Sequence, residues 1–182
     1  MIQIEYLPIV LTGIGIMASI LYYASVLRNA NKTQQMQLET RQAQLFMSLY
    51  QTFSSPEFIK NWDHVNWRIE FKDWEDAFNK IHPKKNPEER AIWFSVAAFF
   101  EGVGVLVRRG LIDLSLVDDL LGNMILMTWE RMGPIEKESR IKLDNPDMWN
   151  DFEYVYDEII KFRNLTPGSG LRMHDSAQKY IK

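Results

Sequence analysis

The chain of 182 residues contains no cysteine. This absence excludes a disulfide scaffold, catalysis by a thiol and a zinc site built on cysteine. Three histidines are present, and none follows a glutamate at the Glu-x-x-His spacing of di-iron helical bundles. The H-E-x-x-H motif of zinc enzymes and the G-x-S-x-G motif of serine hydrolases are also missing. We therefore expect no metal, no cofactor and no catalytic residue of a recognised type.

The chain also lacks a strong excess of either charge, since its formal net charge is −3. Proteins that bind nucleic acid normally present a basic surface, so the composition predicts no nucleic-acid partner. The alternation of apolar and polar residues that is typical of β-strands is not found over a convincing length. Apolar residues make up 46% of the chain, which is enough for a packed core. These features predict an all-α fold.

The most informative feature is an uncharged stretch of 22 residues from Tyr6 to Leu27. A helix needs about 20 apolar residues to cross the hydrocarbon core of a bilayer. A cleaved signal peptide would begin with lysine or arginine and end at a small-residue cleavage site, and neither is present. A helix of a soluble core would have a polar face, which this stretch lacks. We predict a retained single-pass anchor over residues 1–28, in contact with the lipid bilayer through residues 6–27.

The charges beside this stretch predict its orientation. Only Glu5 and the terminal amine precede it, whereas three cations follow it: Arg28, Lys32 and Arg41. Because lysine and arginine beside a span favour the cytoplasmic side, we predict that the N-terminus lies outside and the C-terminal domain in the cytoplasm. Within the span, Gly15 and Ser19 are four residues apart. Small residues at this spacing allow a second membrane helix to approach closely, so this pair is a candidate helix contact.

The segment after the span, residues 29–54, has no proline or glycine and is rich in helix formers. We predict that the membrane helix continues through it as a stalk. Leu38 and Leu45 are seven residues apart, and Met36, Ala43 and Tyr50 repeat in the same way. A coiled-coil dimer would use such a repeat, but it is short, and an amphipathic helix packed on its own domain explains it as well.

Start and stop signals divide the remaining chain into helices. The predicted starts are Ser55-Pro56, Asp73, Asn86-Pro87, Ser115 to Asp118 and Asn145-Pro146. The predicted stops are Gly110 and Gly133-Pro134, with a separate short helix after the second. We expect a small cytosolic helical bundle over residues 55–165 and a flexible C-terminal tail over residues 166–182.

A lone carboxylate, Glu101, lies within the apolar run from Ala91 to Val107. A second membrane crossing would place this charge in lipid at a cost of several kcal/mol, so we interpret the run as a core helix. Beside Glu101 runs a stripe of alternating large and small residues, as close helix packing requires: Trp93, Ala97, Phe100, Gly104 and Val107.

A buried carboxylate needs a hydrogen-bond donor. Arg108 lies two turns away on the same helix, which is far for a direct bond. Arg131, Arg140 and the indole N–H of Trp129 are better candidates from other helices. We interpret this set as a structural polar tie, with a catalytic general base at Glu101 as the alternative.

These residues also carry a resemblance to a known family. The matching residues are Phe99-Phe100-Glu101, Val103-Gly104, Leu106 to Asp113, Trp129, Pro134-Ile135, Arg140 and Trp149 to Glu153. In order and spacing they resemble a widespread bacterial and archaeal family of uncharacterised proteins, with one N-terminal membrane helix, a polar stalk and a small helical domain. The resemblance extends from Leu7 to about Phe162. It implies a fold and a topology, and no activity.

The sequence is compatible with two functions. The first, which we expect, is a non-catalytic membrane-anchored interaction or accessory protein, for example a subunit of a larger membrane complex. Its partner, another protein or a second copy of the chain, would bind through the membrane helix and the stalk. The alternative is an enzyme of unrecognised type that uses Glu101 with arginines in a helical pocket.

Overall fold

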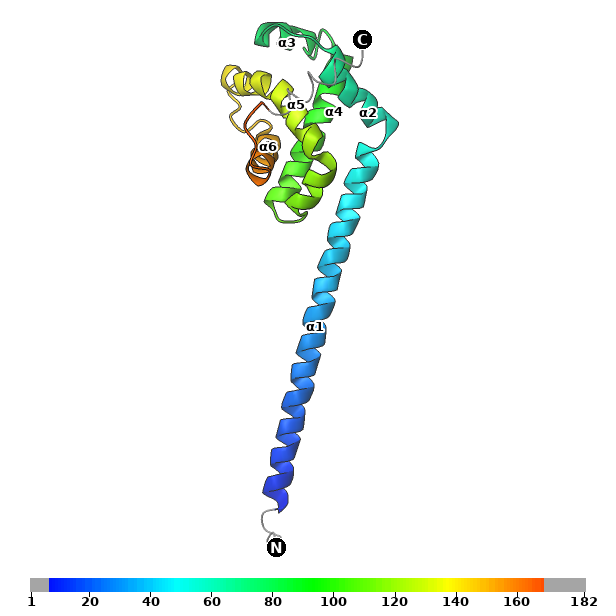
Figure 1. Cartoon of the computed structure of the whole chain (residues 1–182), viewed down its shortest axis with the longest axis vertical. Helices are drawn as coiled ribbons and strands as arrows, with labels where there is room; N and C mark the ends of the chain where they lie inside the picture. Colours follow the sequence, from blue (N-terminus) through cyan, green and yellow to red (C-terminus); the bar gives the residue numbers. More distant parts are fainter. Residues whose placement is uncertain (1–6, 169–182) are drawn as a thin grey trace. The chain divides into compact units, whose positions relative to one another are not determined.

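The computed structural model describes residues 7–168, and all regular structure in that range is helical (Figure 1). The elements are α1 (Leu7–Phe53), α2 (Pro56–Asp63), the π-helical turn η2 (His64–Arg68), α3 (Trp74–Lys80), α4 (Pro87–Arg108), α5 (Leu114–Lys142) and α6 (Asn150–Phe162). The predicted all-α fold is confirmed for these residues. The first residues of the predicted anchor, 1–6, and most of the predicted tail, 169–182, lie outside the described residues.

The chain divides into two compact units, Met1–Gln44 and Leu45–Lys182. Helix α1 begins in the first unit and runs as one unbroken helix from Leu7 to Phe53, through both the apolar stretch and the polar segment that follows it. None of the residues of α1 is buried. The continuous helix predicted from the absence of proline and glycine after the apolar stretch is therefore present.

The second unit has a single hydrophobic core, to which α4, α5 and α6 contribute most of the buried side chains. The largest fully buried ones are Trp93, Phe100, Leu121, Ile125, Leu126, Met132, Phe152 and Ile159. The stripe predicted on α4 faces this core, since Trp93, Ala97, Phe100 and Gly104 are all buried. The run from Ala91 to Val107 thus packs inside the second unit as a core helix.

Several helix ends follow the predicted signals. The Ser55 side chain accepts a hydrogen bond from the backbone N–H of Phe58 at the start of α2. The Asp73 side chain accepts one from Asp76 at the start of α3. After α4, Gly110 has a positive φ of 65°, a conformation that glycine adopts without steric cost.

Three predicted helix ends are wrong. Helix α5 is capped by Asp113, whose side chain accepts from the backbone N–H of Ser115, ahead of the predicted cap. Helix α6 begins at Asn150, after the predicted start at Asn145. Most notably, α5 continues through Gly133-Pro134 to Lys142.

The continuation of α5 has a packing explanation. A Cβ added at Gly133 would lie 3.0 Å from the indole ring of Trp129, so the ring lies over the glycine backbone. Beyond the proline, Ile135, Glu136 and Ser139 are again buried. Burial on both sides of Pro134 outweighs the local cost of the missing N–H.

Candidate functional site

The apolar part of α1 presents its side chains to the outside. Exposed fractions are 59% for Ile14 and 61% for Ile20. The hydroxyls of Thr12 and Ser19 each donate a hydrogen bond of 2.8 Å to a backbone oxygen one turn earlier, in Pro8 and Gly15 respectively. The polar groups of these two side chains are thus satisfied within the helix, as the interior of a bilayer requires. Helix α1 is long and apolar enough to cross a membrane.

Glu101 lies where α4 meets the start of α6. The N-cap residue of α6, Trp149, has a φ of 57° and makes no side-chain capping hydrogen bond. Instead, Oε2 of Glu101 accepts a hydrogen bond of 2.7 Å from the backbone N–H of Phe152. The first backbone N–H groups of a helix have no partner inside it, and a carboxylate placed there satisfies them. Glu101 therefore caps α6 from another helix.

The electrostatics of Glu101 follow from this position. Burial raises the pKa of Glu101 above its usual value, while the backbone N–H groups of Phe152 and Asp151 oppose the rise. The charge of Asp151 raises the pKa further, and that of Arg108 lowers it. One oxygen of Glu101 thus accepts a backbone donor within the fold.

Two further residues of α4 complete what we call the α6 docking site, defined as Glu101, Gly104 and Arg108. A Cβ added at Gly104 would lie 1.9 Å from the backbone oxygen of Asp151, so only glycine permits this approach. The guanidinium of Arg108 pairs with the buried carboxylate of Asp151, with Nε 2.7 Å from Oδ1 and Nη2 2.7 Å from Oδ2. All three residues act on the first turn of α6.

Arg140 and Trp129, on α5, act on the same region. Nε of Arg140 donates to the backbone oxygen of Met148 at 2.8 Å, and its Nη1 pairs with the carboxylate of Glu153. The ring of Trp129 packs edge-on against Phe152, with centroids 4.8 Å apart. The structure thus brings Arg140 and Trp129 close to the start of α6, but neither is the donor to Glu101.

Arg131 lies elsewhere. Its Nε donates to the backbone oxygen of Val65 at 2.8 Å, and its Nη2 to that of Ile69, at the π-helical turn η2. The expected donors to Glu101 were Arg131, Arg140 and Trp129, and the observed donor is a backbone N–H. Sequence patterns do not reveal such a donor, because every residue except proline has one.

A polar cavity of about 370 Å³ lies next to η2 and was not predicted from the sequence. It is lined by His64, Arg68, Ile69, Glu70, Lys80, Asn86 and Glu89. Nε2 of His64 lies 2.7 Å from Oε2 of Glu89, which is 25 residues away in sequence. No local signal in the sequence indicates this pair or the π-helical turn that places His64 beside α4.

A comparison with models of known families shows which family the chain belongs to. The model of the family described as Domain of unknown function (DUF4760) matches residues 9–159. The chain belongs to the DUF4760 family. The family resemblance inferred from the sequence is thereby confirmed.

The DUF4760 match covers α1 from its third residue, the α6 docking site and the residues around the η2 cavity. No curated protein matches this DUF4760 chain significantly. No solved structure matches it significantly either.

Within residues 7–168, no group of three or more histidine, cysteine, aspartate or glutamate side chains is arranged to hold a metal ion. The α6 docking site and the η2 cavity contain hydrogen bonds and ion pairs between residues of the fold.

Proposed function

We propose that this protein is a non-catalytic, membrane-anchored interaction or accessory protein, for example a subunit of a larger membrane complex. In this proposal α1 is a single-pass anchor, the N-terminus lies outside, and the helical domain lies in the cytoplasm. The observation that carries the proposal is the exposure of every side chain from Leu7 to Arg41 on an unbroken helix whose first half is apolar. An apolar surface of this length is stable in lipid and costly in water.

The proposed orientation rests on the cations that follow the apolar stretch, of which Arg28 and Lys32 are the nearest. Because the chain has no cysteine, single cysteines can be placed without background labelling. In intact cells, a membrane-impermeant maleimide should label Gln3→Cys. It should label Lys60→Cys only after lysis. The reverse pattern would overturn the orientation.

The proposed partner contact uses Gly15 and Ser19 on α1. Extraction in a mild detergent, followed by mass spectrometry of the native complex, should yield either a second copy of the chain or a defined partner. Gly15→Leu should weaken this association because it removes the close approach. Gly13→Leu is the matched control, since it adds the same side chain on a different face of the helix. A lone monomer in the wild-type extract would contradict the accessory role.

The second candidate, an enzyme that uses Glu101 with arginines, is less well supported. Its carboxylate accepts the Phe152 N–H, and Arg108 pairs with Asp151. Both polar groups therefore have partners within the fold. An unchanged phenotype in a stably folded Glu101→Gln variant would argue against this candidate, and loss of the phenotype would revive it.

A further inference from the structure

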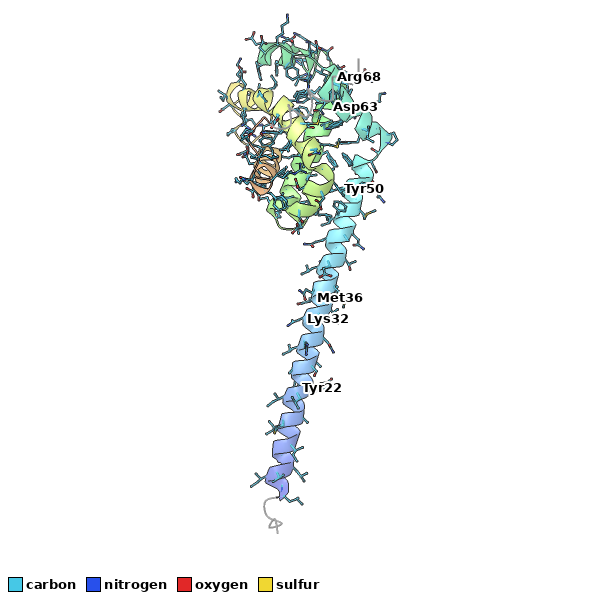
Figure 2. All side chains as sticks on the ribbon, viewed as in Figure 1. Tyr22, Lys32, Met36, Tyr50, Asp63 and Arg68 are labelled. Atoms are coloured by element: carbon cyan, nitrogen blue, oxygen red, sulfur yellow. The ribbon has the colours of Figure 1, made fainter. Side chains whose placement is uncertain are left out.

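The η2 cavity takes no part in the proposed anchor or in the α6 docking site. Its walls come from three separate segments: the turn η2 with the two residues after it, the end of α3, and the start of α4. A second cavity of about 340 Å³ shares Glu70 and Lys80 with the first and is also lined by Phe71, Lys72, Asp76 and Arg131. Figure 2 labels Arg68 at the end of η2, following Asp63 at the end of α2.

The backbone of η2 is held in an uncommon conformation. The N–H of Ile69 donates to the backbone oxygen of His64 at 3.1 Å, which closes the wide π-helical turn. Arg131 donates to the oxygens of Val65 and Ile69 and so stabilises the turn from α5. Single π-helical turns occur frequently at functional sites. Here the turn places His64 and Arg68 on the wall of one cavity.

The charges in the cavity fall into two groups. In the first, the ionisable groups have partners within the fold: His64 contacts Glu89 at 2.7 Å, and Lys80 pairs with Asp76 at 2.9 Å. Nζ of Lys80 also donates to the backbone oxygen of Glu70 at 2.5 Å. These contacts leave little capacity for a ligand.

The second group consists of Arg68 and the side chain of Glu70. Among residues 7–168, neither side chain lies within ion-pairing distance of an opposite charge, and both residues are exposed. Glu70 acts on Arg131 only at longer range, where its charge opposes the lowering of the Arg131 pKa that burial causes. The cavity therefore offers one available guanidinium and one available carboxylate.

We propose that the η2 cavity binds a small zwitterion of the amino-acid class, with its carboxylate on Arg68 and its ammonium on Glu70. A guanidinium matches a carboxylate with two parallel hydrogen bonds, and an ammonium donates readily to a carboxylate. A simple anion would be repelled by Glu70 and Glu89, and a simple cation by Arg68 and Lys80. The cavity volume lies at the lower end of the range of about 300–1,000 Å³ for small-molecule sites, which suits a ligand of this size.

The test measures binding to the full-length chain in detergent micelles by equilibrium dialysis against each of the twenty L-amino acids. At least one should bind saturably. For that amino acid, the analogue without the ammonium group and the analogue without the carboxylate should each bind at least about tenfold more weakly, because each loses a charge-assisted contact. No binding by any of the twenty overturns the proposal. Equal binding of the analogue without the ammonium also overturns it, because the site would then bind anions.

Amino-acid substitutions in the cavity test which side chains contact the ligand. Arg68→Gln and Glu70→Gln should each weaken binding about tenfold or more while leaving the thermal unfolding temperature unchanged, because both side chains are exposed. Arg109→Gln and Glu57→Gln, exposed charges that do not line the cavity, are the matched controls and should bind as the wild type does. Unchanged binding in both cavity variants would overturn the site. The binding experiment does not depend on the anchor, so the membrane proposal and the ligand proposal fail separately.

Discussion

Helix α4 and the first half of α1 are alike in composition and opposite in environment. Both are long and apolar enough to cross a membrane, but none of the most apolar 18 residues of α1 is buried in the fold, against a third of those of α4. The difference lies in what interrupts each apolar run. Helix α4 contains a glycine that touches another backbone and a carboxylate that caps another helix, whereas the apolar run of α1 contains no charge. In this chain both helices pass the hydropathy criterion, and the charge of Glu101, which has a partner in the fold, separates the core helix from the candidate span.

The largest expected effect concerns the closest approach of α4 to α6. Gly104→Ala would place a Cβ 1.9 Å from the backbone oxygen of Asp151, so the two helices must separate. We expect a loss of about 3 kcal/mol in the free energy of unfolding, measured by denaturant titration. Gly102→Ala is the control, because its Cβ would meet nothing within 4 Å. There we expect a gain of up to about 1 kcal/mol from helix propensity. Equal effects at both positions would contradict the close approach.

In the apolar part of α1, we expect an added charge to disturb membrane insertion, not the packing of the fold. Ile16→Arg should raise the free energy of membrane insertion by about 3 kcal/mol, because the charge would lie near the centre of the span. The measurement is the fraction of protein that stays in membranes after alkaline extraction. Leu38→Arg, on an exposed position of the polar segment, should leave that fraction unchanged. If Ile16→Arg also leaves it unchanged, residues 6–27 are not the anchor.

The buried carboxylate of Glu136 makes the stability of the domain depend on pH. Glu136 is 4% exposed and accepts a hydrogen bond of 2.6 Å from the indole N–H of Trp93. Burial raises the pKa of Glu136 from 4.5 to about 7, although the Trp93 hydrogen bond and the charges of Arg140 and Arg90 oppose the rise. The folded state therefore binds this proton more tightly than the unfolded state does. The protonated Glu136 therefore contributes fully to the free energy of unfolding below about pH 4.5, and this contribution is lost as the pH rises to about 7.

Glu136→Gln tests this contribution, because the amide is neutral at every pH and its oxygen still accepts from Trp93. At pH 8 we expect the variant to be more stable than the wild type by roughly 3 kcal/mol. The gain should disappear at pH 4. The measurement is the free energy of unfolding across this pH range. A wild-type and a variant curve that run parallel would show that Glu136 does not titrate in this way.

The smallest effect is expected at Glu101. Glu101→Ala leaves the Phe152 N–H without its acceptor and should lower the free energy of unfolding by about 1 kcal/mol. Glu101→Gln keeps an oxygen acceptor, and burial already disfavours the charge, so it should change stability by less than about 0.5 kcal/mol. Denaturant titration at pH 7 separates the two variants. A larger loss for Glu101→Gln than for Glu101→Ala would mean that the negative charge itself matters more than the cap.

Much of the fold follows from local signals in the sequence. The start of α2 at Pro56, the start of α3 after Asp73 and the end of α4 before Gly110 depend on residues within one turn of the boundary. The same holds for the continuous α1, whose sequence contains no proline after Pro8 and no glycine after Gly15. In these places local propensity and tertiary packing agree.

The predictions from sequence are wrong or incomplete where contacts between residues far apart in the chain determine the local structure. Gly133-Pro134 is a stop signal by itself, yet burial on both sides keeps α5 helical through it. The η2 turn depends on two hydrogen bonds from Arg131, more than 60 residues away. Of the predicted polar tie, the position of Glu101 on a core helix could be inferred from the sequence, and the structure shows its side chain to be half-buried. Its partner could not, because that partner is a backbone group whose position only the packed helices define.

The cap that Glu101 provides has a consequence for the order of folding. The N-cap residue of α6, Trp149, is in a left-handed conformation, and its side chain makes no capping hydrogen bond. An isolated helix of 13 residues is marginal in water even with good caps. We therefore expect α6 to form only once α4 is in place, so that α6 depends on a residue made about fifty positions earlier. During synthesis, the domain would then stay incomplete until α6 leaves the ribosome.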